Sequence, residues 1–168
     1  VSYFQGTEYM ARDLPSAQEL KILEPVRDQI RPEVFTTVYQ PPVSDGTGNL
    51  RTNLRAALVL LKEAGWEVKD QKLTNTETGD IFTFELLTYS PTTERIAIPL
   101  QENLKKLGIE MTIRQVDTSQ FVNRWHEHEF DMISMSYRAN AYPSTSLQIV
   151  WRSNFVDSTY NQANVTDE

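Results

Sequence analysis

The segment from residue 81 to residue 116 constrains the fold most strongly, because a helix pattern separates two β-strand patterns there. The first strand pattern, Ile81–Leu87, is rich in β-branched and aromatic residues. Apolar residues at helical spacing follow, and Gly108 ends that helix pattern. The second strand pattern, Met111–Val116, alternates in polarity. Two strands joined by a crossover of this length are predicted to lie parallel, as a right-handed βαβ unit.

Two further helices are predicted before this unit. Ser16 and Glu19 have the spacing of a capping box, which predicts a helix from about Ala17 to the residues before Pro25. The second helix is predicted from four leucines at helical spacing, with Asn49 as its N-cap and Gly65 as its left-handed end. Those leucines are Leu50, Leu54, Leu58 and Leu61.

The remaining elements are predicted to be short. Residues 69–80 indicate a hairpin turn between short strands, and Thr118 or Ser119 is predicted to cap a short helix whose buried face is Phe121 and Trp125. Asp131–Tyr137 is predicted to be the last strand. Pro99 is expected to kink the preceding helix or to shift its regular start towards Ile98.

Composition excludes several classes of function. The chain has 168 residues, which is enough for one domain with a hydrophobic core, and it has no cysteine for disulfides or thiol catalysis. Its formal net charge of -7 and the absence of a basic stripe argue against a nucleic-acid partner. No apolar run approaches the roughly 20 residues that span a bilayer.

Metal binding and catalysis find little support in the sequence. His126 and His128 are two positions apart, so on a helix they point to different faces, whereas helical zinc sites use histidines four apart. The segment Asp45–Asn49 lacks the closing glutamate of a calcium loop. No nucleophile motif and no phosphate-binding loop is present, so no catalytic residue, metal or cofactor is expected. A carboxylate pair of the kind that hydrolases use stays open, because an acidic chain offers many.

A ligand site is predicted after the last strand, where the chain becomes polar and aromatic. Rings supply contact area, and a few polar groups orient a small ligand. In open α/β sheets, ligands lie beyond the carboxyl ends of the strands. The alternative for each ring is packing in the core. The predicted ligand-binding residues are Tyr137, Arg138, Asn140, Tyr142, Trp151, Arg152, Tyr160 and Asn161.

Several short motifs in the same order resemble the family 5 extracellular solute-binding proteins, the oligopeptide receptors of ABC importers. They include the helix end Leu104–Ile109, the run Ser119–Arg124 and the strand opening Phe130–Met132. The sequence Leu61–Trp66 and the Pro-Pro pair that follows Gln40 resemble the branch that serves oligopeptide and microcin C importers.

This resemblance implies an α/β fold: the C-terminal lobe of a type II periplasmic binding protein, with a mixed sheet, a βαβ unit and flanking helices. The whole chain, residues 1–168, is then expected to be one domain, the second lobe of a two-lobed receptor. Residues 1–49 would be an irregular and helical entry segment, 50–137 the α/β core, and 138–168 a ligand-side loop region.

The function that the resemblance implies is capture of an oligopeptide or peptide-like solute between two lobes. The expected partners are an N-terminal lobe of the same protein and an ABC permease in the inner membrane. The expected location is the periplasm, with a signal peptide in the parent protein. Two alternatives from other classes are a small hydrolase that uses a carboxylate pair and a protein-interaction domain.

Overall fold

The structure is a computed structural model that describes residues 4, 6–40, 43, 46–136, 144–156, 158–161 and 163–165. The chain divides into two compact units. The first comprises residues 1–43 and 138–145, and the second comprises residues 44–137 and 146–168. Within the described ranges, no helix combines the length and the apolar character that crossing a membrane requires.

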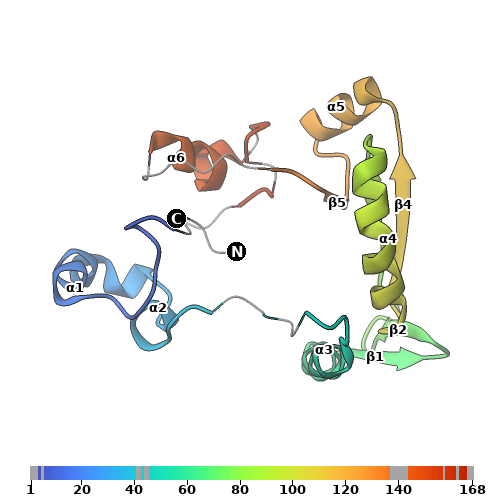
Figure 1. Cartoon of the computed structure of the whole chain (residues 1–168), viewed down its shortest axis with the longest axis horizontal. Helices are drawn as coiled ribbons and strands as arrows, with labels where there is room; N and C mark the ends of the chain where they lie inside the picture. Colours follow the sequence, from blue (N-terminus) through green and yellow to red (C-terminus); the bar gives the residue numbers. More distant parts are fainter. Residues whose placement is uncertain are drawn as a thin grey trace. The chain divides into compact units, whose positions relative to one another are not determined.

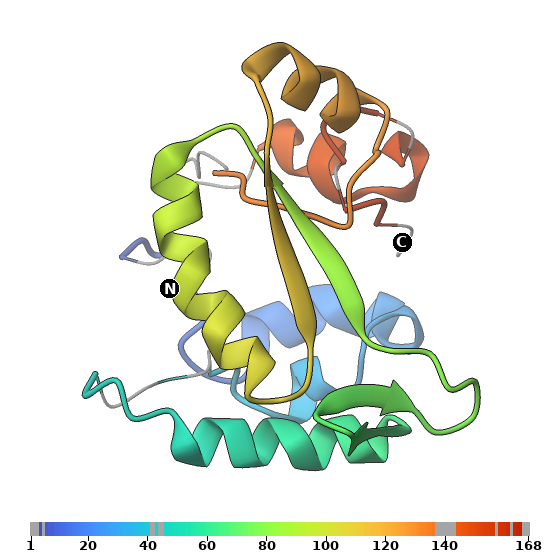
Figure 2. The same ribbon diagram turned by 90° about the vertical axis from the view of Figure 1, so that its right-hand side faces the viewer.

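The second unit is built on a three-stranded parallel sheet (Figures 1 and 2). Strand β3 (Thr83–Thr88) is central, with β4 (Glu110–Gln115) on one side and β5 (Met132–Ile133) on the other. Helix α4 (Pro91–Lys105) connects β3 to β4 and runs alongside β4, so the predicted parallel βαβ unit is confirmed. The last strand is shorter than the predicted seven residues, because only its first two apolar residues pair with β3.

A hairpin and a helix lie at the other end of this unit from α5, the helix Thr118–His126 (Figure 2). Strands β1 (Trp66–Lys69) and β2 (Lys72–Asn75) pair antiparallel, and helix α3 (Arg51–Glu63) lies beside them. Asp70 and Gln71 join the strands with φ of 49° and 66°, as in the two-residue turn that suits a twisted hairpin. A hairpin is therefore present in this region, but its turn is at residues 70–71, and β2 lies inside the segment 69–80 that was predicted to be the turn.

Two adjoining hydrophobic clusters form the core of the second unit. One contains Leu73, Leu107 and Ile109, against which apolar residues of α3 and the hairpin pack. The other contains Leu86, Ala97 and Met111, so α4 covers one face of the parallel sheet. The amphipathic patterns are only partly used as predicted: Leu54, Leu61 and Leu104 pack against the clusters, whereas Leu58 of α3 and Ile96 and Leu100 of α4 are exposed.

Two of the predicted helix ends are confirmed. Ser16 and Glu19 form a complete capping box at the start of α1 (Ala17–Leu23). Gly108, at φ 79°, ends α4 with two Schellman bonds: its own N–H donates to the Lys105 carbonyl, and the Ile109 N–H donates to the Leu104 carbonyl.

Two predicted caps differ from the structure. Asp117, rather than Thr118 or Ser119, caps α5 (Thr118–His126), because its carboxylate accepts the Gln120 N–H at 2.9 Å. Asn49 lies one residue before the position that caps α3, although its side-chain oxygen still accepts the Arg51 N–H at 3.2 Å.

Pro99 lies inside α4 and does not delay its start, which is at Pro91. A proline at this position removes the hydrogen bond to the Arg95 carbonyl. Both residues are exposed, so water can satisfy that carbonyl. The prediction that the helix begins near Ile98 is therefore wrong.

The first unit is helical and small. It contains α1, a 3₁₀ helix (Glu24–Gln29) and α2 (Glu33–Thr36), and none of these three helices buries a side chain completely. The Arg27 guanidinium lies 4.2 Å from the centre of the Phe35 ring and 3.1 Å from the Glu24 carboxylate. The second unit also contains α6 (Thr145–Trp151), apart from its first residue, and a second 3₁₀ helix (Ser153–Phe155).

Candidate functional site

The carboxyl ends of β3 and β5 lie at the same edge of the parallel sheet, and a pocket opens there. Its volume is about 400 Å³. Three segments line it: the residues at and after the end of β3, the start of α5, and the residues after β5. We call it the carboxyl-edge pocket, lined by Thr88, Tyr89, Ser90, Thr93, Thr118, Phe121, Val122, Trp125, Ser134, Met135 and Ser136.

The lining of this pocket mixes polar and apolar side chains and includes no charged one. Six of its side chains are aliphatic hydroxyls: Thr88, Ser90, Thr93, Thr118, Ser134 and Ser136. Three aromatic rings complete it, and the Tyr89 and Phe121 ring centres are 4.7 Å apart. Hydroxyls both donate and accept hydrogen bonds, and rings supply contact area. The pocket is therefore suited to a small polar group that carries no net charge.

Local hydrogen bonds hold the loop between β3 and α4. Thr88 is 2% exposed, and its hydroxyl accepts the Ser90 N–H at 3.1 Å and donates to the Ser90 carbonyl at 3.4 Å. Ser90 then precedes Pro91, whose fixed φ suits the first position of a helix. The sequence Thr-Tyr-Ser-Pro thus turns the chain at the edge of the sheet.

Trp125 contributes an unsatisfied donor to the site. Its side chain is half-buried and lines the pocket, and its Nε1 is buried without a hydrogen-bond acceptor among the described residues. A buried donor without a partner is costly, and this nitrogen is closed off from the space of the pocket.

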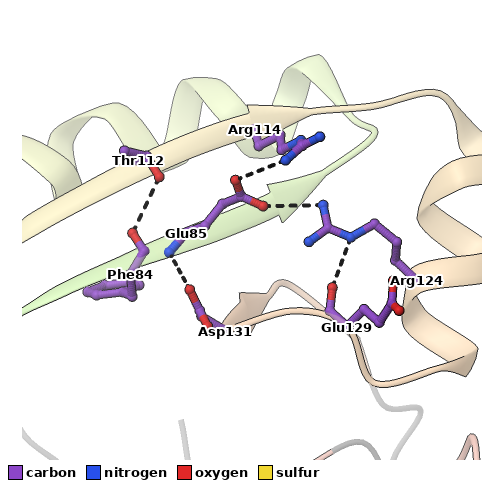
Figure 3. Close-up of polar contacts among 7 residues, drawn as sticks. All are labelled: Phe84, Glu85, Thr112, Arg114, Arg124, Glu129 and Asp131. Carbon is purple, nitrogen blue, oxygen red and sulfur yellow. Dashed lines mark hydrogen bonds and ion pairs between the residues drawn. The ribbon is translucent and has the colours of Figure 1, made fainter.

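A group of polar contacts fixes α5 to the central strand (Figure 3). The Glu85 carboxylate lies 3.3 Å from Arg124 and 3.6 Å from Arg114, and the Glu85 backbone N–H donates to the Asp131 carboxylate at 2.9 Å. Arg124 also donates to the Glu129 carbonyl at 2.9 Å. These contacts tie the helix that carries Phe121 and Trp125 to the strand that leads into the pocket.

The predicted site residues fall into two groups. Tyr137, Arg138, Asn140 and Tyr142 lie outside the described residues. Trp151 ends α6 and is 40% exposed, Arg152 follows it, and Tyr160 is 62% exposed. The carboxyl-edge pocket is lined by none of the four described residues, which are Trp151, Arg152, Tyr160 and Asn161. Their role in ligand binding remains a prediction.

Asn161 has a structural role that its sequence did not indicate. It is completely buried, and its amide group donates to the carbonyls of Arg152 at 3.3 Å and Val165 at 2.9 Å. Its side-chain oxygen accepts the Val165 N–H at 3.0 Å. One side chain thus holds together two turns of the C-terminal segment.

Sequence reasoning placed the site beyond the ends of the strands but missed the residues that line this pocket. The available signal was hydroxyl residues at or directly after the end of each strand, Thr88 and Ser90 for β3 and Ser134 and Ser136 for β5. Such serines and threonines are common in loops, so the signal becomes specific only when the topology brings both runs to one edge.

The two histidines do not form a metal site with other residues of the described ranges. His126 is the exposed last residue of α5, and His128 has a left-handed backbone at φ 54°. Within those ranges, no group of three histidine or carboxylate side chains is placed to hold a metal ion.

Comparison with known proteins identifies close relatives. A protein of Escherichia coli K12 named "uncharacterized protein YejA" is 47% identical over 164 residues, which are 98% of this chain and 27% of that protein. A "probable peptide-binding protein YejA" of Agrobacterium fabrum is 40% identical over 156 residues, 93% of this chain and 25% of that protein. This chain therefore spans about a quarter of the length of these relatives.

A solved structure and a family model agree with these relatives. The oligopeptide-binding protein AppA of Bacillus subtilis, solved in complex with a nonapeptide, matches 67% of this chain and 23% of its own. Its TM-score is 0.58, with 28% identity. Residues 27–158 match the model of the bacterial extracellular solute-binding proteins, family 5 Middle. This match covers well over half of the chain, which therefore belongs to the family 5 bacterial extracellular solute-binding proteins.

Proposed function

We propose that this chain is the second lobe of the solute-binding component of an ABC importer, and that it helps to capture oligopeptides or peptide-like solutes. The observation that carries the proposal is the family match over residues 27–158. The naming of one relative as a probable peptide-binding protein, and the nonapeptide complex of AppA, support peptides as the solute class.

The carboxyl-edge pocket supports the proposal on chemical grounds. A peptide backbone presents an N–H and a C=O at almost every residue, and hydroxyl side chains can pair with either group. A pocket that recognises the backbone through hydroxyls and rings tolerates varied side chains. Because the other lobe would supply further contacts, this chain alone is expected to bind weakly.

The same proposal includes partners and location. The closed two-lobed receptor would deliver its solute to a permease of the inner membrane from the periplasm. Catalysis has no part in it. A receptor of this kind returns its solute unchanged, which separates it from the hydrolase alternative.

The test is mass spectrometry of the small molecules released from the natively purified full-length protein that contains this chain. We expect short peptides or a peptide conjugate. The control is the same protein unfolded, dialysed and refolded before release, which should yield none. Release of sugars alone would contradict the peptide class, and cleavage of added peptides by the purified protein would support a hydrolase.

A further inference from the structure

We propose that an apolar segment of the remaining polypeptide, outside this chain, packs into a pocket of the first unit and covers it. The pocket has a volume of about 630 Å³. It is lined by residues 10–16, by three residues of α1 and by three residues from α2 to Tyr39, and we call it the first-unit pocket. The inference goes beyond the proposed function, because it concerns how this chain is held in the longer protein.

The lining of the first-unit pocket is mainly apolar, and much of it is exposed. Eight of its thirteen lining residues are apolar or aromatic. Four of the eight are large side chains that the structure leaves open: Leu14 is 41% exposed, Ile22 75%, Val34 43% and Tyr39 63%. Single exposed apolar residues are common, but four around one hollow are typical of a surface that another segment covers.

The first unit has almost no core of its own. Its helices have seven, six and four residues, and isolated helices of such lengths are marginal in water. Among its described residues none is buried, whereas both hydrophobic clusters belong to the second unit. A unit of this size therefore needs to bury apolar surface against something else.

The charged side chains at the pocket are used by the backbone of the same unit. The Glu19 and Asp13 carboxylates each accept a backbone N–H, at 2.7 and 2.8 Å. The Arg12 guanidinium donates to a backbone carbonyl at 3.5 Å. The surface that is left to recognise an occupant is apolar, so the covering segment is expected to present aliphatic or aromatic side chains.

The lengths of the relatives favour the remaining polypeptide as the occupant. The residues aligned with the Escherichia coli relative are 98% of this chain but only 27% of that protein, so almost three quarters of it lies outside. Most of the lining precedes residue 27, where the family match begins, so that match does not account for the pocket. A segment of the same protein is tethered, which gives it a higher effective concentration than a second copy.

The experiment measures how fast N-ethylmaleimide labels a single added cysteine. This chain has no cysteine, so Ile22→Cys places one thiol in the first-unit pocket. The matched control is Lys21→Cys, because Lys21 is the neighbouring residue of α1, is exposed and does not line the pocket. Both variants are made in the full-length protein that contains this chain and in the 168-residue chain. Peptide mapping identifies the labelled residue.

In the full-length protein we expect Ile22→Cys to be labelled at least about tenfold more slowly than Lys21→Cys, because the thiol is reached only when the covering segment opens. In the 168-residue chain the two thiols should be labelled at similar rates. The slow labelling should not depend on protein concentration. Val34→Cys, on α2, should behave like Ile22→Cys and takes its place if that variant does not fold.

Three results would overturn the inference. Equal labelling of Ile22→Cys and Lys21→Cys in the full-length protein would show that the pocket is open. Slow labelling of Ile22→Cys in the 168-residue chain as well would show that this chain covers the pocket itself. Slow labelling that appears only at high protein concentration would assign the pocket to a second copy. No solute enters this experiment, so the proposed function stands or falls separately.

Discussion

Gly108 offers the most quantitative test of how the second unit is held together. It ends α4 in the left-handed conformation, and its carbonyl accepts the Leu73 N–H at 2.7 Å, so the helix end touches strand β2. A Cβ at this position would lie 2.6 Å from the Leu73 nitrogen and 3.0 Å from the Lys72 carbonyl carbon. Both are backbone atoms that cannot move without displacing the strand.

The expected cost of Gly108→Ala has two parts. A left-handed alanine costs about 1 kcal/mol, and forcing the backbone of β2 aside costs about 2 kcal/mol, as overpacking does elsewhere. The total is about 3 kcal/mol of unfolding free energy. Gly79→Ala is the control, because Gly79 has φ 78° but no atom within 4 Å of an added Cβ. It should lose only about 1 kcal/mol.

The assay is urea unfolding of the 168-residue chain, followed by circular dichroism, for wild type and both variants. The difference between the two variants isolates the steric part, since both glycines share the same backbone conformation. Equal losses for the two variants would refute the close approach of α4 to β2. A Gly108→Ala chain that does not fold, beside a folded Gly79→Ala chain, would agree with it.

Three further predictions concern single side chains. Glu85→Gln should lower the unfolding free energy by about 1 kcal/mol, measured by urea titration, because it weakens the half-buried contact with Arg124. Hydrogen bonds from Ser16 lower the pKa of Glu19 below its ordinary value of 4.5. The Glu19 carboxylate therefore stabilises α1 fully above pH 4.5, and this stabilisation is lost as the pH falls through the lowered pKa. Ser16→Ala should bring the Glu19 pKa, measured by NMR, back towards 4.5. Asn161→Asp should cost about 3 kcal/mol locally, seen as faster backbone amide exchange in the C-terminal segment, because a carboxylate would face two carbonyl oxygens.

One measurement could contradict each of these three predictions. Glu110→Gln alters an exposed ion pair with Lys72 and should change the unfolding free energy little. If Glu110→Gln lowered the unfolding free energy as much as Glu85→Gln does, the half-buried Glu85–Arg124 pair would contribute no more than an exposed pair. An unchanged Glu19 pKa in Ser16→Ala would show that the capping box is not populated. Unchanged exchange in Asn161→Asp would show that this side chain does not hold the C-terminal turns.

The elements that could be predicted from sequence are those whose signals are local. The capping box at Ser16 and the Schellman end at Gly108 need only neighbouring residues, and both are confirmed. The βαβ order around β3 needs only chain length and polarity patterns. These features depend on backbone geometry that the same residues produce in most proteins.

The remainder depends on contacts between distant residues. Strand β5 pairs with β3 only at Leu86 and Leu87, a limit that no pattern in the segment from Asp131 reveals. The cap of α5 is Asp117 because the strand β4 ends early enough to leave that residue extended. The pocket arises where loops from three parts of the chain meet, so its residues could be recognised only from the topology.

The strand order has a consequence for how the chain is made. The central strand β3 is synthesised first and both of its partners later, so it has no sheet neighbour until β4 and then β5 emerge. From residue 88 to residue 133 the ribosome adds 45 residues, which takes about 2 to 9 s at typical rates. Until β5 has been added, the sheet around β3 is incomplete, so holdase chaperones that shield this segment should raise the yield of folded protein.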